Sequence, residues 1–293
     1  ITDIRIVGII GGSGLDDPDI IEHRKEHDVS TPFGNPSDTI IEGEIGGVKL
    51  YLLARHGRKH HINPTNVNYR ANIWALRQLG CTHLIVSTAC GSLKEDIRPG
   101  DLAIPNDLID RTTKRIQTFH DGFSASPAGV CHLPMYPVFN ERTRKVLVST
   151  AMDLGYERVH VEATMVTIEG PRFSTRAESN MFRQWGGHLI NMTSCPEAIL
   201  AKEAGLLYGA VAIATDYDCW RKGCESVNVQ DVLKTFSQNV VKVKKLLVKA
   251  VENIAKEDWT TDIQEAKKYC LKKCHLFLFM NPNLIKLLGS TSP

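Results

Sequence analysis

Two acidic residues, Asp216 and Asp218, end an apolar run that begins at Val211. In an extended backbone, residues two positions apart point to the same side, so both carboxyl groups are expected at one site where a strand ends. Like charges held close together in a partly dry pocket oppose each other's ionisation, which lets one group keep a proton near neutral pH. The pair then complements an adenine's N7 and amino group. A solvated loop is the alternative, because acidic side chains usually remain exposed.

A glycine-rich turn, Gly11-Gly12-Ser13-Gly14, follows the first apolar run, at 4–10. Glycines let several backbone N–H groups converge on an anion, and Ser13 adds a hydroxyl. The turn lacks the lysine of a Walker loop and the third glycine of a dinucleotide-binding loop, and Leu15 replaces a glycine of the nucleophile elbow. An anion site and a plain tight turn both remain open here.

Basic and hydroxyl-bearing residues follow two further strand-like runs. Arg55 and His56 come after the run at 48–53, and a cluster of this kind suits an oxyanion because arginine supplies forked donors. A solvated basic loop is the alternative. Thr88 and Ala89 lie near the end of the run at 84–91, where open α/β sheets place their ligands.

Strand-like and helical patterns alternate along the chain, which indicates an α/β fold with a mainly parallel sheet covered on both faces. Further strands are expected at 39–44, 102–104, 163–168 and 189–193. Helices are expected at 66–79, 141–154, from a capping box at Thr175 and Glu178 onward, and at 228–254. No repeat or linker is visible, so a single domain is expected. The segment 111–137 has little periodicity, and a loop of that length is usually functional or part of an interface.

The overall composition favours a small-molecule ligand. The 293 residues carry a formal net charge of only +2, so neither nucleic acid nor an anionic membrane is an expected partner. No apolar run reaches the roughly 20 residues of a spanning helix, and a soluble, cytoplasmic protein is expected. The eight cysteines show no disulfide spacing, and Cys270 and Cys274 lack a second pair, so no metal site is expected.

Six segments taken together resemble the nucleoside phosphorylase family, and within it the S-methyl-5'-thioadenosine phosphorylases. They are Gly11–Gly14, Arg55–Gly57, Ser87–Ser92, Glu169–Phe173, Asn191–Thr193 and Thr215–Asp218, in family order. The resemblance implies a single α/β domain around a mixed, mostly parallel, barrel-like sheet surrounded by helices. It also implies a homotrimer with shared active sites, located in the cytoplasm and also the nucleus. Residues 1–270 correspond to that domain, and 271–293 form a tail unlike the family's usual end.

The resemblance also assigns roles to individual residues. The phosphate-binding residues it implies are Ser13, Arg55, His56, Thr88, Ala89 and Thr193. The nucleoside-binding residues it implies are Phe173 against the purine, Met192 at the ribose, the apolar Val229, Val232 and Leu233 at a 5'-methylthio group, and His132 from a neighbouring subunit. Asp216 is expected to protonate N7, and Asp218 to recognise N6.

The expected reaction is displacement at the ribose anomeric carbon of 5'-methylthioadenosine by phosphate, which releases adenine and 5-methylthioribose 1-phosphate. Phosphate is the co-substrate, and no further cofactor is expected. A 6-oxopurine nucleoside phosphorylase is the nearest alternative, but Asp218 and the apolar turn at 229–233 argue against it. A hydrolytic nucleosidase would have no use for so many anion donors. A non-catalytic nucleotide-binding sensor would need the pocket without the phosphate-binding residues.

Overall fold

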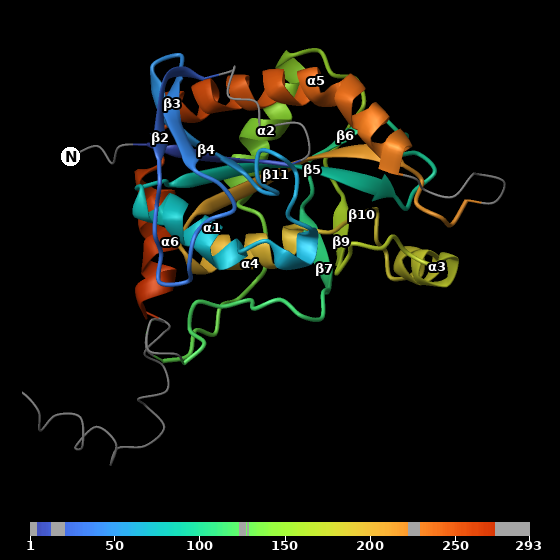
Figure 1. The fold of residues 1–293 in the computed structure, drawn as a ribbon. Coiled ribbons are helices and arrows are strands. Elements are labelled where there is room, and N and C mark those ends of the chain that lie inside the picture. Colours follow the sequence, from blue (N-terminus) through green and yellow to red (C-terminus); the bar gives the residue numbers. More distant parts are fainter. Residues whose placement is uncertain (1–4, 13–20, 123–126, 128, 222–228, 273–293) are drawn as a thin grey trace, which may run out of the picture.

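The computed structural model describes residues 5–12, 21–122, 127, 129–221 and 229–272 (Figure 1). In that part of the chain, eleven strands form one sheet. The strands are β1 (Val7–Gly11), β2 (Glu22–His27), β3 (Ile40–Ile45), β4 (Val48–Ala54), β5 (His83–Ser92), β6 (Leu102–Ala103), β7 (Asp107–Arg111), β8 (Val159–His160), β9 (Thr164–Ile168), β10 (Leu189–Asn191) and β11 (Leu207–Asp216). The helices are η2 (Pro64–Asn66), α1 (Tyr69–Gln78), α2 (Glu141–Asp153), α3 (Arg176–Gln184), α4 (Ser194–Glu203), α5 (Val229–Lys256) and α6 (Thr260–Lys272).

The sheet is mixed and mostly parallel, as the sequence predicted. Strand β5 is its centre: it pairs in parallel with β1 and with β11, and its last residues pair antiparallel with β10. The described strands run in the order β2-β3-β4-β1-β5-β10-β9-β7, with β11, β6 and β8 branching from β5. This path does not return to its first strand, so the sheet curves without closing into a barrel.

Helices cover both faces of the central strands because those strands are apolar on both sides. In Figure 1, α2 and α5 lie above the central strands, and α1 and α4 lie below them. Val7 and Ile9 of β1 belong to the core under α2 and α5, whereas Ile10 belongs to the core over α1 and α4. This is the two-residue alternation of a strand. Each fully buried aliphatic side chain of this kind contributes about 1.5–3 kcal/mol.

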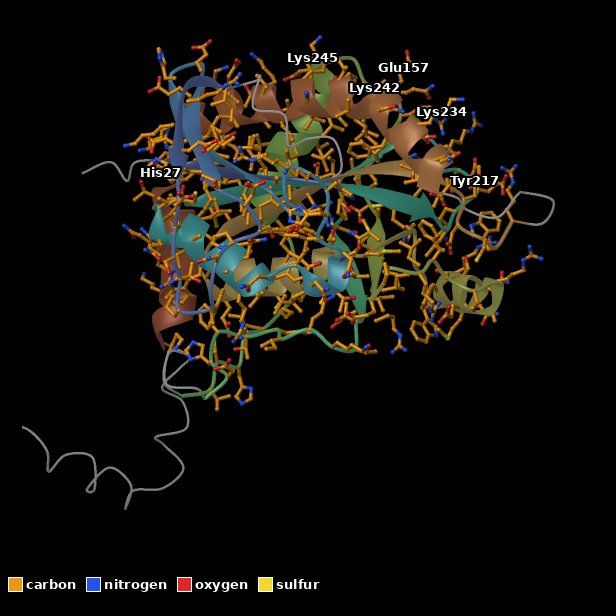
Figure 2. All side chains as sticks on the ribbon, viewed as in Figure 1. His27, Glu157, Tyr217, Lys234, Lys242 and Lys245 are labelled. Carbon is orange, nitrogen blue, oxygen red and sulfur yellow. The ribbon has the colours of Figure 1, made fainter. Side chains whose placement is uncertain are left out.

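Helix α5 is amphipathic and longer than any other described helix. Its inner stripe, including Val243, Leu246 and Leu247, is fully buried against the sheet. Lys242 and Lys245 point away from the sheet into solvent (Figure 2). The sequence predicted this helix at 228–254, close to its observed bounds. No helix among the described residues combines the length and apolarity needed to cross a membrane.

Parallel strands β1, β4, β5 and β11 all end at the same edge of the sheet. The ends of these strands and the residues that follow them therefore meet there. Gly12 and Arg55 follow β1 and β4, whereas Thr88 lies in the second half of β5 and Asp216 ends β11. One close approach depends on a glycine: a Cβ on Gly91 would lie 2.9 Å from Ile190 Cγ2 and 3.0 Å from Asp216 Oδ1. The sheet thus brings residues distant in sequence to one place.

Candidate active site

A cavity of about 390 Å³ lies at this edge of the sheet. Ten residues predicted for the site line it. They are Arg55, His56, Thr88, Ala89, Phe173, Met192, Thr193, Asp216, Asp218 and Val232. The structure therefore brings together the residues that the sequence assigned to phosphate, sugar and purine.

Four predicted residues are not placed in this cavity. Ser13 and the tail from 273 onward lie outside the described residues, and the side chains of Val229 and Leu233 are likewise not described. His132 is exposed and borders a separate surface depression beside Glu203. A position outside this chain's own cavity is compatible with the expectation that His132 serves a neighbouring subunit.

Arg55 is held in place by a buried carboxylate that the sequence did not reveal. Its Nε and Nη2 donate to Glu197 at 2.7 and 2.9 Å, and its Nη1 donates to Ser87 O at 3.0 Å. Both side chains are only 1% exposed. Burial opposes the charge of Arg55, but Glu197 outweighs it and raises the arginine pKa. Three of the five N–H donors of Arg55 are used in this way, which leaves two for a ligand.

Packing requires a glycine at position 12, directly after β1. A Cβ on Gly12 would lie 2.9 Å from Ser87 O and 3.2 Å from Arg55 Nη1. Its N–H donates to Ser87 Oγ at 3.0 Å. The backbone donor of Gly12 is therefore already used within the chain, and the rest of this turn lies outside the described residues.

His56 and Thr88 are oriented by fixed partners. His56 is mostly buried, and its Nδ1 lies 2.8 Å from Ile62 O. Asn191 Nδ2 donates to Thr88 Oγ1 at 3.0 Å and to Ser194 Oγ at 2.8 Å. Asn191 belongs to a motif that the sequence singled out, but its role of fixing the Thr88 hydroxyl depends on a contact across 103 residues.

The carboxyl pair reaches the cavity through a geometry other than the predicted one. The pairing of β11 with β5 shifts between Ala214 and Asp216, and Asp218 has a φ of +48°. The strand therefore ends at Asp216, and a left-handed turn brings Asp218 back to the cavity. The backbone N–H of Asp218 donates to Asp216 Oδ1 at 2.7 Å. The prediction of a continuous extended backbone is wrong, whereas both acids do line one cavity.

Both carboxyl groups have a raised pKa. Burial is the main cause for Asp216, and the charge of nearby Asp218 adds to it. Burial is also the main cause for Asp218. The hydroxyls of Ser174 and Ser179 are close enough to favour the charged form of Asp218. Even so, Asp218 Oδ2 is buried with no hydrogen-bond partner among the described residues. A purine amino group is a donor that could satisfy it.

A second close approach, between Gly170 and Met192, shapes another side of the cavity. Gly170 has a φ of +68°, and a Cβ there would lie 2.6 Å from Met192 Sδ. Glycine at this position lets Met192 lie against the turn that precedes Phe173. Val232 adds an apolar wall to the same cavity.

Arg115 fixes the backbone around Met192 from the long loop after β7. Its Nη1 donates to Met192 O and to Cys195 O, each at 2.6 Å. Its Nη2 donates to Glu169 O at 2.6 Å. The guanidinium is 1% exposed. The sequence predicted a functional or interface loop at 111–137 but gave no reason to select this residue.

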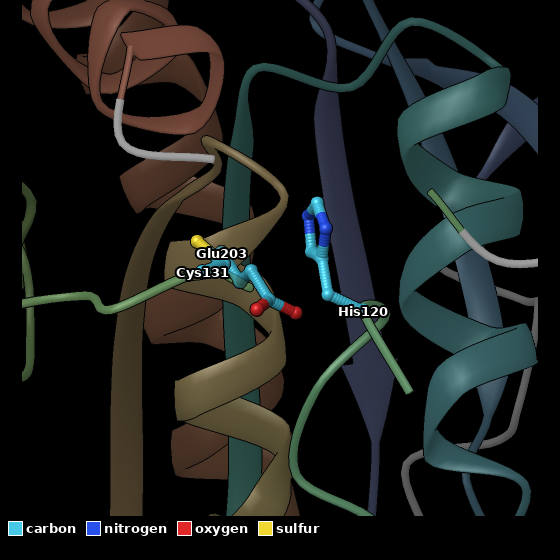
Figure 3. Close-up of side chains that lie close together, drawn as sticks. All are labelled: His120, Cys131 and Glu203. Carbon is cyan, nitrogen blue, oxygen red and sulfur yellow. The ribbon is translucent and has the colours of Figure 1, made fainter. Parts of the chain in front are cut away.

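A group of potential metal ligands lies outside this cavity, where the long loop meets the end of α4 (Figure 3). Ligand atoms of His120, Cys131 and Glu203 lie within 4.8 Å of one another. The two oxygens of Glu203 also accept hydrogen bonds from Thr118 Oγ1 at 2.7 Å and Phe119 N at 2.6 Å. Glu203 therefore anchors the loop to α4, with or without an ion.

Known phosphorylases match this chain over most of its length. The family model described as "Phosphorylase superfamily" matches residues 6–252. An S-methyl-5'-thioadenosine phosphorylase of Drosophila melanogaster is 71% identical over 262 residues, which cover 89% of this chain and 90% of the relative. A purine nucleoside phosphorylase of Drosophila pseudoobscura pseudoobscura is 53% identical over 261 residues, covering 89% and 90% respectively.

Solved structures extend the comparison to ligands. A methylthioadenosine phosphorylase from Schistosoma mansoni in complex with adenine superposes with a TM-score of 0.90 at 45% identity, covering 92% of this chain and 99% of that chain. A variant of the adenosine/methylthioadenosine phosphorylase from the same organism, in complex with methylthioadenosine, has a TM-score of 0.89 at 43% identity, covering 93% and 99%.

Proposed function

The chain belongs to the phosphorylase superfamily, and we propose that it cleaves 5'-methylthioadenosine with inorganic phosphate. The products are adenine and 5-methylthioribose 1-phosphate. One observation carries the proposal: carboxyl groups with raised pKa values share a single cavity with the donors Arg55 and Thr88. The first set suits a purine leaving group, and the second suits an oxyanion.

The proposed mechanism is displacement at the anomeric carbon through a transition state with oxocarbenium character. Phosphate beside Arg55 and Thr88 stabilises the developing positive charge of the sugar and forms the new C–O bond. Asp216 gives its proton to N7 as the bond to the purine breaks. General acid assistance of this kind is typically worth ~10²–10⁴ in rate. Asp218 orients the base through its amino group.

Preference for a methylthio group follows from the wall of the cavity. Val232 offers no hydrogen bond to a 5'-hydroxyl, whereas it can pack against a thioether and methyl group. The 53% identical purine nucleoside phosphorylase keeps a 6-oxopurine activity as the second candidate. Asp218 argues against it, because its buried Oδ2 has no hydrogen-bond partner among the described residues and can accept from a 6-amino group, whereas O6 of a 6-oxopurine is itself an acceptor.

A phosphate-dependence assay tests the function. Purified protein is incubated with methylthioadenosine or inosine, each with and without phosphate, and the released base is quantified. Adenine release that requires phosphate, with little hypoxanthine release, is expected. Release without phosphate would indicate a hydrolase, a preference for inosine would indicate the 6-oxopurine enzyme, and binding without release would indicate a sensor.

The assembly is a further part of the proposal. We infer that the chain forms a homotrimer in which His132 approaches the site of a neighbouring copy. Three large hydrophobic residues of the same loop, Ile116, Val130 and Tyr136, are exposed, which supports a partner on this face. Phosphate is the co-substrate, and no metal or organic cofactor is required.

A further inference from the structure

His56 presents a hydrogen-bond acceptor to the cavity. Its Nδ1 lies 2.8 Å from the carbonyl oxygen of Ile62. A carbonyl oxygen only accepts, so this nitrogen must carry the proton of the ring. In a neutral imidazole the other nitrogen, Nε2, then has a lone pair and no hydrogen. Nε2 is the ring nitrogen that remains to meet a ligand.

In the unliganded protein the ring is neutral near pH 7. Burial, followed by the positive charge of Arg55, lowers the pKa of His56 to about 4. A group with a lowered pKa is protonated only below that value, so His56 has a second N–H donor only in acid. An ordinary histidine beside an anion would be expected to do the opposite and gain a proton.

The neighbouring arginine does not decide which anion binds. Arg55 is paired with Glu197 through two hydrogen bonds, so much of its charge is already compensated. The hydroxyls of Thr88 and Thr193 can donate to any oxyanion. Anions of equal charge and shape can therefore be distinguished only by a group that accepts a hydrogen bond from the ligand, which here is His56 Nε2.

We propose that His56 makes the site selective for an oxyanion that carries a proton, hydrogen phosphate, over a fully deprotonated one of the same shape, sulfate. The proposal rests on the proposed function, which places phosphate beside Arg55 and His56. The P–OH group donates to Nε2. A sulfate oxygen in the same place would bring its lone pairs against the lone pair of Nε2, and this contact is repulsive.

Hydrogen phosphate and sulfate form a well-matched pair of probes. Near pH 8, phosphate is almost entirely the dianion with one hydroxyl, and sulfate is a tetrahedral dianion with none. Isothermal titration calorimetry of the full chain with each sodium salt, at constant ionic strength, gives the ratio of the two dissociation constants. We expect phosphate to bind at least about tenfold more tightly, since one hydrogen bond to a charged group changes a dissociation constant by about that factor or more.

His56→Phe tests the assignment to this residue. The phenyl ring keeps much of the shape of the imidazole but has no lone pair for a P–OH group, so the phosphate-to-sulfate ratio should fall toward one. His60→Phe is the matched control, because it makes the same change in the ring that lies 4.8 Å away. The control should keep the wild-type ratio.

Two outcomes overturn the proposal. The first is a wild-type protein whose dissociation constants for sulfate and phosphate differ by less than about threefold, which is smaller than the effect expected of one hydrogen bond to a charged group. The second is a ratio that His56→Phe leaves unchanged. Failure of the proposed function looks different, because adenine release would then not depend on phosphate. Intact phosphorolysis with equal binding of the two anions would remove only the role assigned to His56.

Discussion

The hydroxyl of Thr215 bears on the protonation of Asp216. Thr215 Oγ1 lies 2.7 Å from Asp216 Oδ2 and 3.1 Å from Cys90 O. A hydroxyl has one proton, so Thr215 can donate fully to only one of these two oxygens at a time. Burial raises the pKa of Asp216, and this effect outweighs the contacts with Thr215 Oγ1 and with Asp218 N, which lower it. A proton held there is available to a leaving purine.

Replacing Asp216 with asparagine should remove the acid while keeping the shape of the side chain. We expect Asp216→Asn to lower kcat for methylthioadenosine by ~10²–10⁴, the usual contribution of a general acid. Its activity on inosine relative to methylthioadenosine should improve, because an amide placed at N7 can also donate to O6, which lies on the same edge of the purine. Initial rates with both substrates and saturating phosphate measure this. Asp153→Asn, at the exposed end of α2, is the control. An unchanged ratio of the two activities would remove the assigned role.

His83 should make the folded state sensitive to acid. It is fully buried, packs edge-on against Trp259 with ring centroids 4.5 Å apart, and burial lowers its pKa to about 3. The unfolded chain, with an ordinary pKa of about 6.5, therefore takes up the proton first. Stability is complete above about pH 6.5 and falls as the pH drops toward 3, by at most about 1.4 kcal/mol per pH unit.

Urea unfolding at several pH values between 7 and 4 tests this prediction. His83→Gln should flatten the dependence of the unfolding free energy on pH, whereas the exposed His61→Gln should leave it steep. His56 contributes in the same direction because its pKa is also lowered. A slope that is equal in wild type and His83→Gln would show that His83 is not the titrating group.

At the scale of elements, the apolar strands could be predicted because a strand that is buried on both faces has a continuous run of hydrophobic residues. β1, β5 and β11 were found in this way, with bounds within a few residues. β2 was not found: its sequence, Glu-His-Arg-Lys-Glu-His, has no apolar residue, and it pairs with β3 through its backbone. β7 was not found either: the predicted loop begins at Arg111, the last residue of this strand, and the mixed pattern at 107–110 suggested no element.

The ligand-facing residues could be predicted from strand ends and motifs, whereas the residues that hold them could not. Glu197 lies 142 positions from Arg55, and Arg115 lies 77 positions from Met192. Nothing in the local sequence marks a charge that will be buried and paired at such a distance. The left-handed turn at Asp218 was also missed, because a positive φ is uncommon in residues other than glycine and no local pattern indicates it here.

The long loop should contribute to the site through Arg115. Arg115→Met leaves the carbonyl groups of Met192 and Cys195 without this donor. Glu169 O also loses it but keeps Thr65 Oγ1 at 3.3 Å. Each buried unsatisfied acceptor costs about 1–3 kcal/mol. We expect the KM for the nucleoside to rise more than kcat falls, because Met192 is the proposed ribose contact. Steady-state kinetics and a thermal melt measure both effects.

Two further variants separate positioning from mere stability. Arg115→Lys keeps the charge but not the fork of donors, so it should recover part of the KM. Lys114→Met changes an exposed neighbour and should change neither quantity. If Arg115→Met lowers the melting temperature while the nucleoside KM stays at its wild-type value, Arg115 supports the fold alone.

At the scale of the whole molecule, the exposed apolar residues are unevenly placed. Ile116 and Val130 are 49% and 50% exposed, and Tyr136 is 85% exposed, all in the loop between β7 and α2 that also carries His132. Single exposed hydrophobic residues are common. Three in one loop favour a protein interface. The charge of the chain is near neutral, so solvation by charge does not oppose association.

If copies associate through this loop, weakening it should affect assembly and activity together. We expect the double variant Val130→Asp and Tyr136→Ser to shift the protein from a trimer toward a monomer in size-exclusion chromatography with light scattering. Activity should fall with it, because each cavity would lose the His132 of a neighbouring copy. Met152→Ser, which removes a 63% exposed hydrophobic residue from α2, is the matched control and should remain a trimer. The single variant His132→Ala completes the set: it should lower activity while the trimer stays intact. A monomeric double variant with full activity would mean that each chain completes its own site, and the loop would then serve assembly only.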